Sequence, residues 1–245
     1  MVGRATSVLA SRRLAAFVVA AAVVVTWFIV APHLAHLRLW PTILVLSILV
    51  MPGTLLLALI ALPLWRRRRL FPAAIVLGLV AFGCAEAGWG LAGNFAKLWA
   101  AILAGWAFIR LFEELSWVVL VAVVIPLVDI ISVYHGPTKA ITSHHFEVYT
   151  AVAIAFVAPG GAAAYLGPPD VLFFALFLAA ADRFGLRVVW TWVATTSMYG
   201  VTVIIATAAH VGGLPALPFL SVGFLAPNAD IIWRQLRASR TAASP

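Results

Sequence analysis

The stretch Leu166–Phe174 reads Leu-Gly-Pro-Pro-Asp-Val-Leu-Phe-Phe and places Asp170 at the start of an apolar run. An ionisable side chain inside a membrane-spanning segment costs at least about 2.5 kcal/mol by insertion scales, so Asp170 is a candidate functional residue. A second acid, Asp129, has a similar setting in Val-Val-Ile-Pro-Leu-Val-Asp-Ile-Ile-Ser-Val. We therefore expect the two acids to meet within a lipid bilayer.

The composition is that of a membrane protein. Of the 245 residues, 64% are hydrophobic and only 10% are charged, and the mean hydropathy is +1.10. The net charge of +8 does not indicate nucleic-acid binding, because the basic residues form short clusters between apolar runs. The single cysteine, Cys84, excludes an internal disulfide and a cysteine-built metal site. The chain is thus predicted to be an all-α polytopic membrane protein that binds no nucleic acid.

Eight apolar runs have the length needed to cross about 30 Å of hydrocarbon, the sixth being short. They are Leu14 to Ala31, Leu39 to Trp65, Leu70 to Leu91, Ala96 to Phe112, Ser116 to Tyr134, Pro168 to Phe184, Val188 to His210 and Leu214 to Trp233. We treat 1–245 as one transmembrane domain. It consists of an N-terminal four-helix part, 1–113, and a part that carries both acids, 116–233.

The distribution of basic residues predicts the orientation of these spans. Thirteen of the sixteen Lys and Arg residues fall on the side that includes both termini, so the positive-inside rule places both termini in the cytoplasm. The first apolar run follows Arg12 and Arg13 without a convincing small-residue cleavage site, and we expect it to be retained as a span.

The segment from Phe146 to Leu166 is apolar enough to be mistaken for a further span. Pro159-Gly160-Gly161 would break a helix there, and large and small side chains alternate from Ala151 to Phe156 with the period of a strand. Crossing the membrane would also move the basic residues near 183–187 to the outer side. We therefore predict an outward loop with a short strand, Val152 to Phe156.

This topology puts both acids near the outer surface. Asp129 lies about 8 Å from the outer end of the fifth span, at 1.5 Å per residue, and Asp170 lies in the first turn of the sixth. Pro168 and Pro169 suit a first turn, where a missing N–H costs little. Pro126 removes a main-chain hydrogen bond one turn before Asp129.

Two carboxyl groups within hydrogen-bonding reach in a medium of low dielectric cannot both ionise. One can then act as a base toward water while its protonated partner polarises a carbonyl group. The strand, through Val152 and Ile154, and the loop at Pro215 could each offer main-chain groups to an extended peptide. The alternative is that these segments only close the outer surface of the protein.

Three short motifs occur in order along the second part of the chain. The first is Asp129 followed by Val133 and Pro137, the second is Leu166-Gly167-Pro168-Pro169-Asp170, and the third is Gly213-Leu214-Pro215-Ala216-Leu217-Pro218. In order and spacing they resemble the Tyr-Asp, Gly-x-Gly-Asp and Pro-Ala-Leu motifs of the presenilin and signal peptide peptidase family of intramembrane aspartyl proteases. The resemblance covers roughly 118–228.

The resemblance implies a presenilin-like bundle in which Asp129 and Asp170 are the catalytic pair. It implies that the substrates are transmembrane or signal-peptide helices, that no cofactor is needed, and that the chain is a prokaryotic-like member residing in the plasma membrane. The residues that it assigns to the substrate-binding surface are Gly167, Pro168, Pro169, Pro215, Ala216 and Leu217.

Two residues depart from the family pattern. Val128 stands where the family has Tyr, and Pro169 stands where it has its second Gly. A proline in place of a glycine stiffens the chain beside the acid, which could change the range of substrates or mark an inactive relative.

Two other functions fit the same acids. A transporter or channel could use them to bind a proton or a cation, although the first half of the chain contains no counterpart of the Asp129–Asp170 unit. An inactive relative could bind membrane helices without cutting them. A metal site is not expected, because His144 and His145 have no third ligand at zinc spacing.

Overall fold

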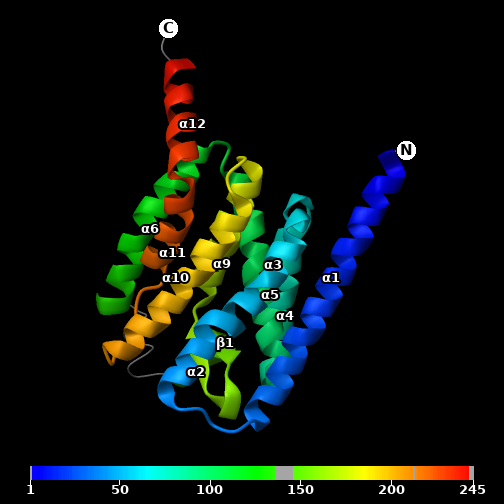
Figure 1. Cartoon of the computed structure of the whole chain (residues 1–245), viewed down its shortest axis with the longest axis vertical. Helices are drawn as coiled ribbons and strands as arrows, with labels where there is room; N and C mark the ends of the chain where they lie inside the picture. Colours follow the sequence, from blue (N-terminus) through cyan, green and yellow to red (C-terminus); the bar gives the residue numbers. More distant parts are fainter. Residues whose placement is uncertain (1, 136–145, 212, 243–245) are drawn as a thin grey trace.

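The computed structural model describes residues 2–135, 146–211 and 213–242 (Figure 1). Pro137, Lys139, His144 and His145, on which parts of the sequence analysis rest, lie outside these residues. The helices are α1 Val2–Val30, η1 Ala31–His33, α2 Leu39–Val45, η2 Leu46–Val50, α3 Met51–Ala61, η3 Leu62–Arg66, α4 Leu70–Glu86, α5 Gly90–Phe108, η4 Ile109–Leu111, α6 Leu115–His135, α8 Phe146–Val152, η5 Pro159–Gly161, α9 Pro168–Arg183, α10 Val188–Ala208, α11 Leu217–Leu225, η6 Ala226–Asn228 and α12 Ala229–Ala242. The strands are β1 Ile154–Val157 and β2 Ala163–Leu166.

Within the described residues, five helices are long and apolar enough to cross a membrane, which indicates a membrane protein. They are Ser11–His33, Leu39–Arg66, Gly90–Leu111, Leu115–Val133 and Val188–Ala208. The other three predicted spans contain shorter helices. Helix α4 has 17 residues, α9 has 16 and α11 has nine.

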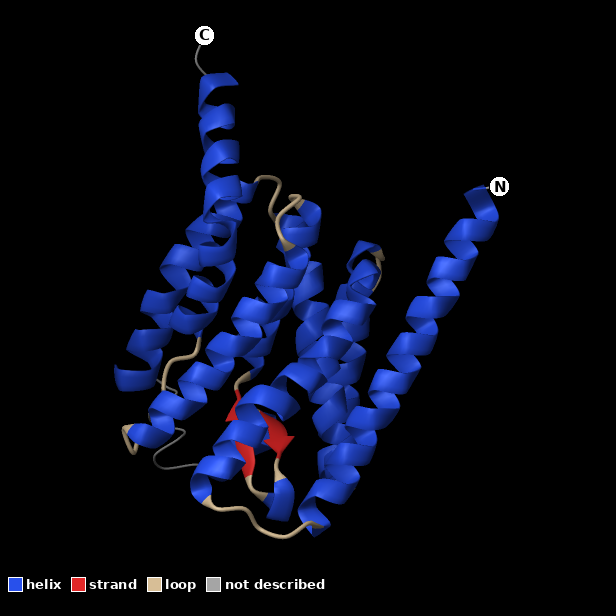
Figure 2. Cartoon of the chain, viewed as in Figure 1, coloured by secondary structure: helices blue, strands red, loops and turns tan. Residues whose placement is uncertain are grey.

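The helices form a bundle in which both termini lie at one end and the two strands lie at the other (Figures 1 and 2). Helix α9 is central and packs against α5, α10 and α11. Every residue from Phe174 to Ala181 is buried, so this helix has no lipid-facing side over that length.

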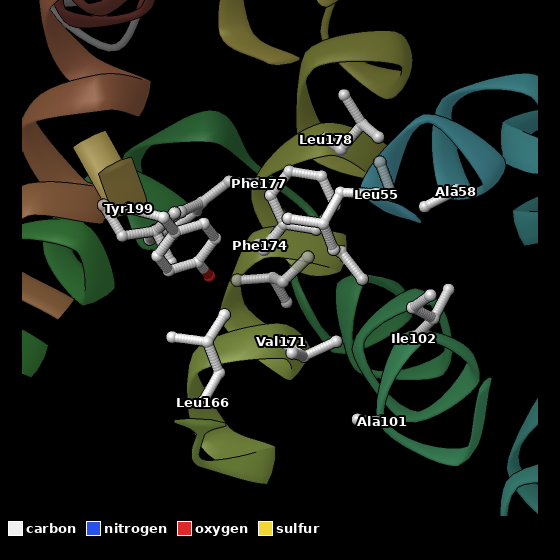
Figure 3. Close-up of a cluster of buried hydrophobic side chains, with 14 of the residues drawn as sticks. Leu55, Ala58, Ala101, Ile102, Leu166, Val171, Phe174, Phe177, Leu178 and Tyr199 are labelled. Carbon is white, nitrogen blue, oxygen red and sulfur yellow. The ribbon is translucent and has the colours of Figure 1, made fainter. Parts of the chain in front are cut away.

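Aromatic rings fill the space between α9 and its neighbours on the side of α10 and α11 (Figure 3). The ring of Phe177 stacks on that of Phe224 with 4.6 Å between centroids, and Phe174 packs against Tyr199. These contacts fix α9 against the helices that follow it, since buried aromatic pairs contribute beyond the area that they remove from solvent.

On the opposite side of α9, Gly105 permits a close approach between α5 and α9. A Cβ atom at this position would lie only 2.2 Å from the main-chain oxygen of Leu172 and 2.9 Å from the Cβ of Ala175. Small residues let helix backbones approach closely in membranes, and here the missing side chain brings α5 against the start of α9.

The segment Phe146–Leu166 forms a short helix and a β-hairpin, and it is not one of the five candidate spans. The strands pair antiparallel, with Ile154 opposite Leu166 and Val157 opposite Ala163. The turn uses Gly160 and Gly161, whose φ angles are 77° and 81°, a conformation that glycine adopts without steric cost.

The predicted bounds of the strand were wrong at both ends. Val152 is the last residue of α8, and β1 runs from Ile154 to Val157. The physical reason is a contact with a positively charged side chain on another helix, which the alternation of side chains could not reveal. The Lys97 ammonium binds the carbonyl groups of Thr150 and Ala151 at the end of α8, and such a charge favours a helix C-terminus.

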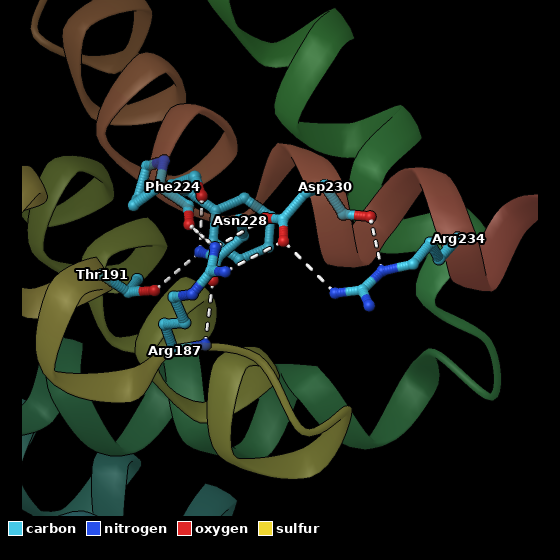
Figure 4. Close-up of polar contacts among 7 residues, drawn as sticks. Arg187, Thr191, Phe224, Asn228, Asp230 and Arg234 are labelled. Atoms are coloured by element: carbon cyan, nitrogen blue, oxygen red, sulfur yellow. Dashed lines mark hydrogen bonds and ion pairs between the residues drawn. The ribbon is translucent and has the colours of Figure 1, made fainter.

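A buried amide joins the helices at the end of the bundle that carries the termini (Figure 4). The side chain of Asn228 donates to the Thr191 hydroxyl and to the carbonyl oxygen of Phe224, both at 2.8 Å, and accepts the main-chain N–H of Arg187 at 2.9 Å. Asn228 thereby fixes the start of α10 to the end of α11. Asp230, which pairs with Arg187 and Arg234, is half-exposed, so those ion pairs contribute little.

The close approach at Gly105 gives a first prediction. Gly105→Ala should lower the free energy of unfolding by about 1–3 kcal/mol, because α5 and α9 must separate. Gly83→Ala is the control, since nothing lies within 4 Å of a Cβ placed there, and it should be neutral or slightly stabilising. Thermal unfolding in detergent would compare them, and equal effects would refute the close packing.

Asn228 gives a second prediction. Asn228→Ala should destabilise the protein by about 1–3 kcal/mol, because the Thr191 hydroxyl and the Phe224 carbonyl oxygen each lose a donor and the Arg187 N–H loses its acceptor. The matched control is Gln235→Ala, whose exposed amide donates to the carbonyl oxygen of Phe184 at 3.0 Å and should matter far less. Denaturant titration monitored by tryptophan fluorescence would measure both, and a similar loss from the two variants would contradict the assigned role.

Candidate functional site

Asp170 lies in the first turn of α9, where its carboxylate accepts the main-chain N–H of Gly167 at 2.9 Å. This bond is half of a capping box, in which an acid three residues into a helix satisfies an N–H at the helix start. Pro168 and Pro169 occupy the first two helical positions, as predicted. A Cβ at Gly167 would lie 3.2 Å from the carboxylate oxygen, so a larger residue there would crowd the acid.

Asp129 lies on α6, one turn after Pro126. Its carboxylate accepts the main-chain N–H of Leu217 at 3.0 Å. Leu217 is the first residue of α11, so Asp129 is held at the N-terminus of that helix, where negative charge is favoured. Pro215 and Ala216 lead directly into this position, and the third sequence motif is therefore in contact with the first.

The two acids lie on neighbouring helices. Helix α6, which carries Asp129, packs against both α11 and α9, and Asp170 is in the first turn of α9. Both side chains are partly exposed, so solvent can reach them. Each acid is also held by a main-chain N–H at the start of a helix, which fixes the position of both carboxylates.

Tyr199 belongs to the same site, although the sequence analysis did not single it out. Its side chain is fully buried, and its hydroxyl donates to the main-chain oxygen of Asp170 at 2.8 Å. The hydroxyl also lies within electrostatic range of both carboxylates. The available signal in the sequence was a tyrosine inside a predicted membrane span.

Tyr149 approaches Asp170 from α8. Burial, with smaller contributions from Asp170 and Tyr165, raises the pKa of Tyr149 to about 12. Its hydroxyl therefore stays protonated at neutral pH, and its ring packs edge-on against that of Tyr165.

Two polar residues of α5 hold the hairpin, and the sequence analysis did not assign them this role. Asn94 donates to the carbonyl oxygen of Ala155 at 2.9 Å and accepts the Ala155 N–H at 2.8 Å. The Lys97 ammonium donates to the carbonyl oxygen of Ala153 at 2.6 Å. Polar residues three positions apart in an apolar span were the available signal, because such residues rarely face lipid.

An apolar groove of about 1290 Å³ lies between α4, α5 and the start of α9. Its walls are rich in small side chains, among them Ala74, Gly78 and Ala81 on α4 and Ala100, Ala104 and Ala107 on α5. Pro168, Pro169 and Val152 line it near the hairpin, so the groove passes within one residue of Asp170. Ile154, by contrast, is fully buried and pairs with β2.

No protein-family model matches the chain, and comparison with curated proteins and with solved structures gives no significant match. The arrangement of the acids is therefore interpreted from the geometry and from the three sequence motifs.

Tyr199 gives a third prediction. Tyr199→Phe keeps the ring packed against Phe174 but removes the hydrogen bond to Asp170, and it should lower the free energy of unfolding by about 1 kcal/mol. Relative to the wild type, amide hydrogen exchange should be faster at 170–172 in the first turn of α9 and unchanged in α4. Unchanged exchange at 170–172 would show that the hydroxyl does not hold this turn.

Proposed function

We propose that this protein is an intramembrane aspartyl protease that uses Asp129 and Asp170. The observation that carries the proposal is the meeting of two acids from separate apolar helices, each fixed by a main-chain N–H at a helix start. Two interacting carboxyl groups at low dielectric hold one proton between them, which provides a base and an acid in the same site. The resemblance of the three motifs to presenilins and signal peptide peptidases supports the same conclusion.

In the proposed reaction, the ionised carboxylate takes a proton from water as the water oxygen bonds to the carbonyl carbon of the peptide. The protonated partner donates its proton to the carbonyl oxygen. The tetrahedral intermediate then collapses as the ionised carboxylate takes a proton from one of its hydroxyl groups, the C–N bond breaks, and the other carboxyl group gives its proton to the departing amine nitrogen. The products are a free carboxyl group and a free amine, and either acid can begin as the base.

The groove beside Asp170 fits a transmembrane or signal-peptide helix as the substrate. Alanine and glycine on α4 and α5 allow a helix backbone to approach closely, and the groove ends at Pro168 and Pro169, next to the acid. A helix must unwind before its peptide bonds can be attacked, and the two-stranded sheet offers a template for an extended segment. Gly167, Pro215, Ala216 and Leu217 surround the acids and complete the proposed substrate surface.

We further propose a topology for the chain in the membrane. The eight apolar runs would cross the membrane in a presenilin-like arrangement, with α9 and α11 short because they begin below the membrane surface. Both termini would be cytoplasmic, in keeping with their common end in Figure 1, and the hairpin would face outward. The membrane would be the plasma membrane of a prokaryote.

A proton- or cation-coupled transporter is the second candidate, because short helices that begin beside acids within the membrane are also found in transporters. The positive ends of α9 and α11 both point at the acids, which disfavours a bound cation. Proton movement would not require peptide cleavage, so the experiment below separates the two functions.

A fourth prediction concerns the acids themselves. The purified protein should cut a lysine-flanked leucine-alanine helix that contains a central Gly-Gly. Asp129→Asn and Asp170→Asn should each reduce cleavage by at least about 100-fold while leaving the melting temperature nearly unchanged. Asp230→Asn is the matched control and should cut normally, because Asp230 is exposed and distant from the site.

Product masses from a fixed-time digestion would provide the measurement. Normal cleavage by either asparagine variant would refute the acid pair. Proton uptake by vesicles containing the wild-type protein, without any cleavage, would favour the transporter instead.

A further inference from the structure

Four consecutive arginines, Arg66 to Arg69, connect α3 and η3 to α4. This connection lies at the end of the bundle that holds both termini (Figure 1). Arg66 pairs with Asp182 near the end of α9 at 2.9 Å. Arg67, Arg68 and Arg69 are exposed and form no ion pair within the described residues. The cluster therefore leaves positive charge at this end of the bundle that no carboxylate of the described chain pairs with.

The apolar groove between α4 and α5 reaches this cluster. Arg68 lines the groove from the connection before α4, and Arg110 lines it from η4. Nη2 of Arg110 donates to the carbonyl oxygens of Trp65 and Arg67, which holds the guanidinium in place. Its Nε and Nη1 carry the other three N–H groups and make no hydrogen bond in the part of the chain that the structure describes. Two guanidinium groups thus border this end of the groove with donors available to an anion.

The other charged groups near the groove do not oppose an anion at this end. Among the described residues that line it, Glu86 is the one acid, and it lies at the far end of α4, a helix about 26 Å long. Lys97 directs its three N–H groups to carbonyl oxygens at the hairpin. Glu113 and Glu114, which follow η4, do not line the groove. An anion can therefore approach the two arginines without facing a carboxylate on the groove wall.

Beyond the arginines the walls are apolar and open to the outside of the bundle. Phe71, Ile75 and Leu111 line the groove and are 63, 50 and 71% exposed. Nothing lies within 4 Å of a Cβ placed at Gly78, so the floor is open there. In a bilayer the hydrocarbon chains of lipids cover such surfaces when no protein does, because water is excluded at this depth.

The length of this open section matches one leaflet. Gly78 is ten residues beyond Arg68, which is about 15 Å at 1.5 Å per residue. Half of a hydrocarbon core of about 30 Å is also about 15 Å. A lipid whose phosphate lies at Arg68 would therefore extend its acyl chains along α4 to the region of Gly78.

We propose that this half of the groove is a binding site for an anionic phospholipid, with the phosphate at Arg68 and Arg110 and an acyl chain between α4 and α5. Guanidinium groups form charge-assisted and often bidentate hydrogen bonds with phosphate oxygens. Clusters of basic residues beside membrane spans also attract anionic lipids. A zwitterionic lipid has the same phosphate but no net charge, so the rest of the cluster attracts it less.

The lipid would regulate the groove to which the proposed function assigns a substrate helix. This consequence rests on the proposed function, whereas the lipid site does not. A lipid and a helix cannot fill the same space, so a substrate must displace the lipid before it reaches the acids. Anionic lipid should then raise KM for a helical substrate and leave kcat unchanged.

Photolabelling locates the lipid. The probes are phosphatidylglycerol and phosphatidylcholine, each with a diazirine in one acyl chain, added in trace amounts to phosphatidylcholine vesicles that contain the protein. Both probes compete with the same excess of unlabelled lipid, so the ratio of their labels reports relative affinity. We expect phosphatidylglycerol to label 71–78 and 104–111 at least roughly fivefold more than phosphatidylcholine. The two probes should label α6 equally at Leu120 and Leu127, which are 50 and 60% exposed.

Arg68→Gln should reduce this preference roughly fivefold, since one arginine near an anionic headgroup contributes about 1 kcal/mol. Arg69→Gln is the matched control, because it removes the same charge from the same cluster at a residue that does not line the groove, and it should change the preference less than twofold. Gly78→Leu should reduce labelling at 104–111 by filling the space for the acyl chain while leaving the charge unchanged.

Equal labelling of the groove by the two probes would overturn the lipid site. Equal losses from Arg68→Gln and Arg69→Gln would also overturn it, because diffuse attraction by the whole cluster would then explain the preference. Unaltered labelling in Gly78→Leu would remove the acyl chain from the groove.

Cleavage of the lysine-flanked leucine-alanine helix tests the regulation separately. A rise in KM with phosphatidylglycerol in the wild type, and a smaller rise in Arg68→Gln, would support competition. An unchanged KM would overturn the competition. Selective labelling of the groove without any cleavage would refute the proposed function and leave the lipid site standing.

Discussion

The structure depends on the burial of α9 along most of its length. The helix is held by α5 through the missing side chain at Gly105 and by aromatic stacking from α11 at Phe224. Because the helix cannot shift between these neighbours, the acid in its first turn has a fixed position. An acid at the start of a loosely packed, lipid-facing helix would lack this constraint.

Polar groups inside the bundle serve mainly to position main chain. Asn94, Lys97, Trp27 and Tyr199 all direct donors to carbonyl groups of the hairpin or of α9. In a bilayer an unsatisfied carbonyl group costs several kcal/mol, so each of these hydrogen bonds is much more favourable than an unpaired carbonyl group. The N-terminal part of the chain, which carries no catalytic acid in the proposed mechanism, thereby contributes to the geometry of the site.

Several features could be predicted from the sequence because they follow from local rules. Apolar length predicted membrane-spanning helices, five of which the structure bears out, Pro159-Gly160-Gly161 predicted a break in the helical structure, and Pro168-Pro169 predicted the start of α9. The meeting of the first and third motifs followed from the resemblance, and the structure shows it as the contact between Asp129 and Leu217. The second strand, Ala163–Leu166, was not predicted, because its sequence, Ala-Ala-Tyr-Leu, does not alternate large and small side chains.

The roles of Asn94, Lys97 and Tyr199 could not be predicted, because they depend on contacts between residues far apart in the chain. Side-chain alternation placed Val152 in a strand, whereas a cation from another helix ends α8 at that residue. The spacing of apolar residues shows which face of a helix or strand is buried. It does not show which residue a polar side chain will contact.

The hydrogen bond between Asp129 and Leu217 joins residues separated by 88 positions. The chain is made from its N-terminus, so Asp129 enters the bilayer long before its partner has been synthesised. The hydrogen bond that fixes the Asp129 carboxylate therefore forms only after the chain has been made as far as α11.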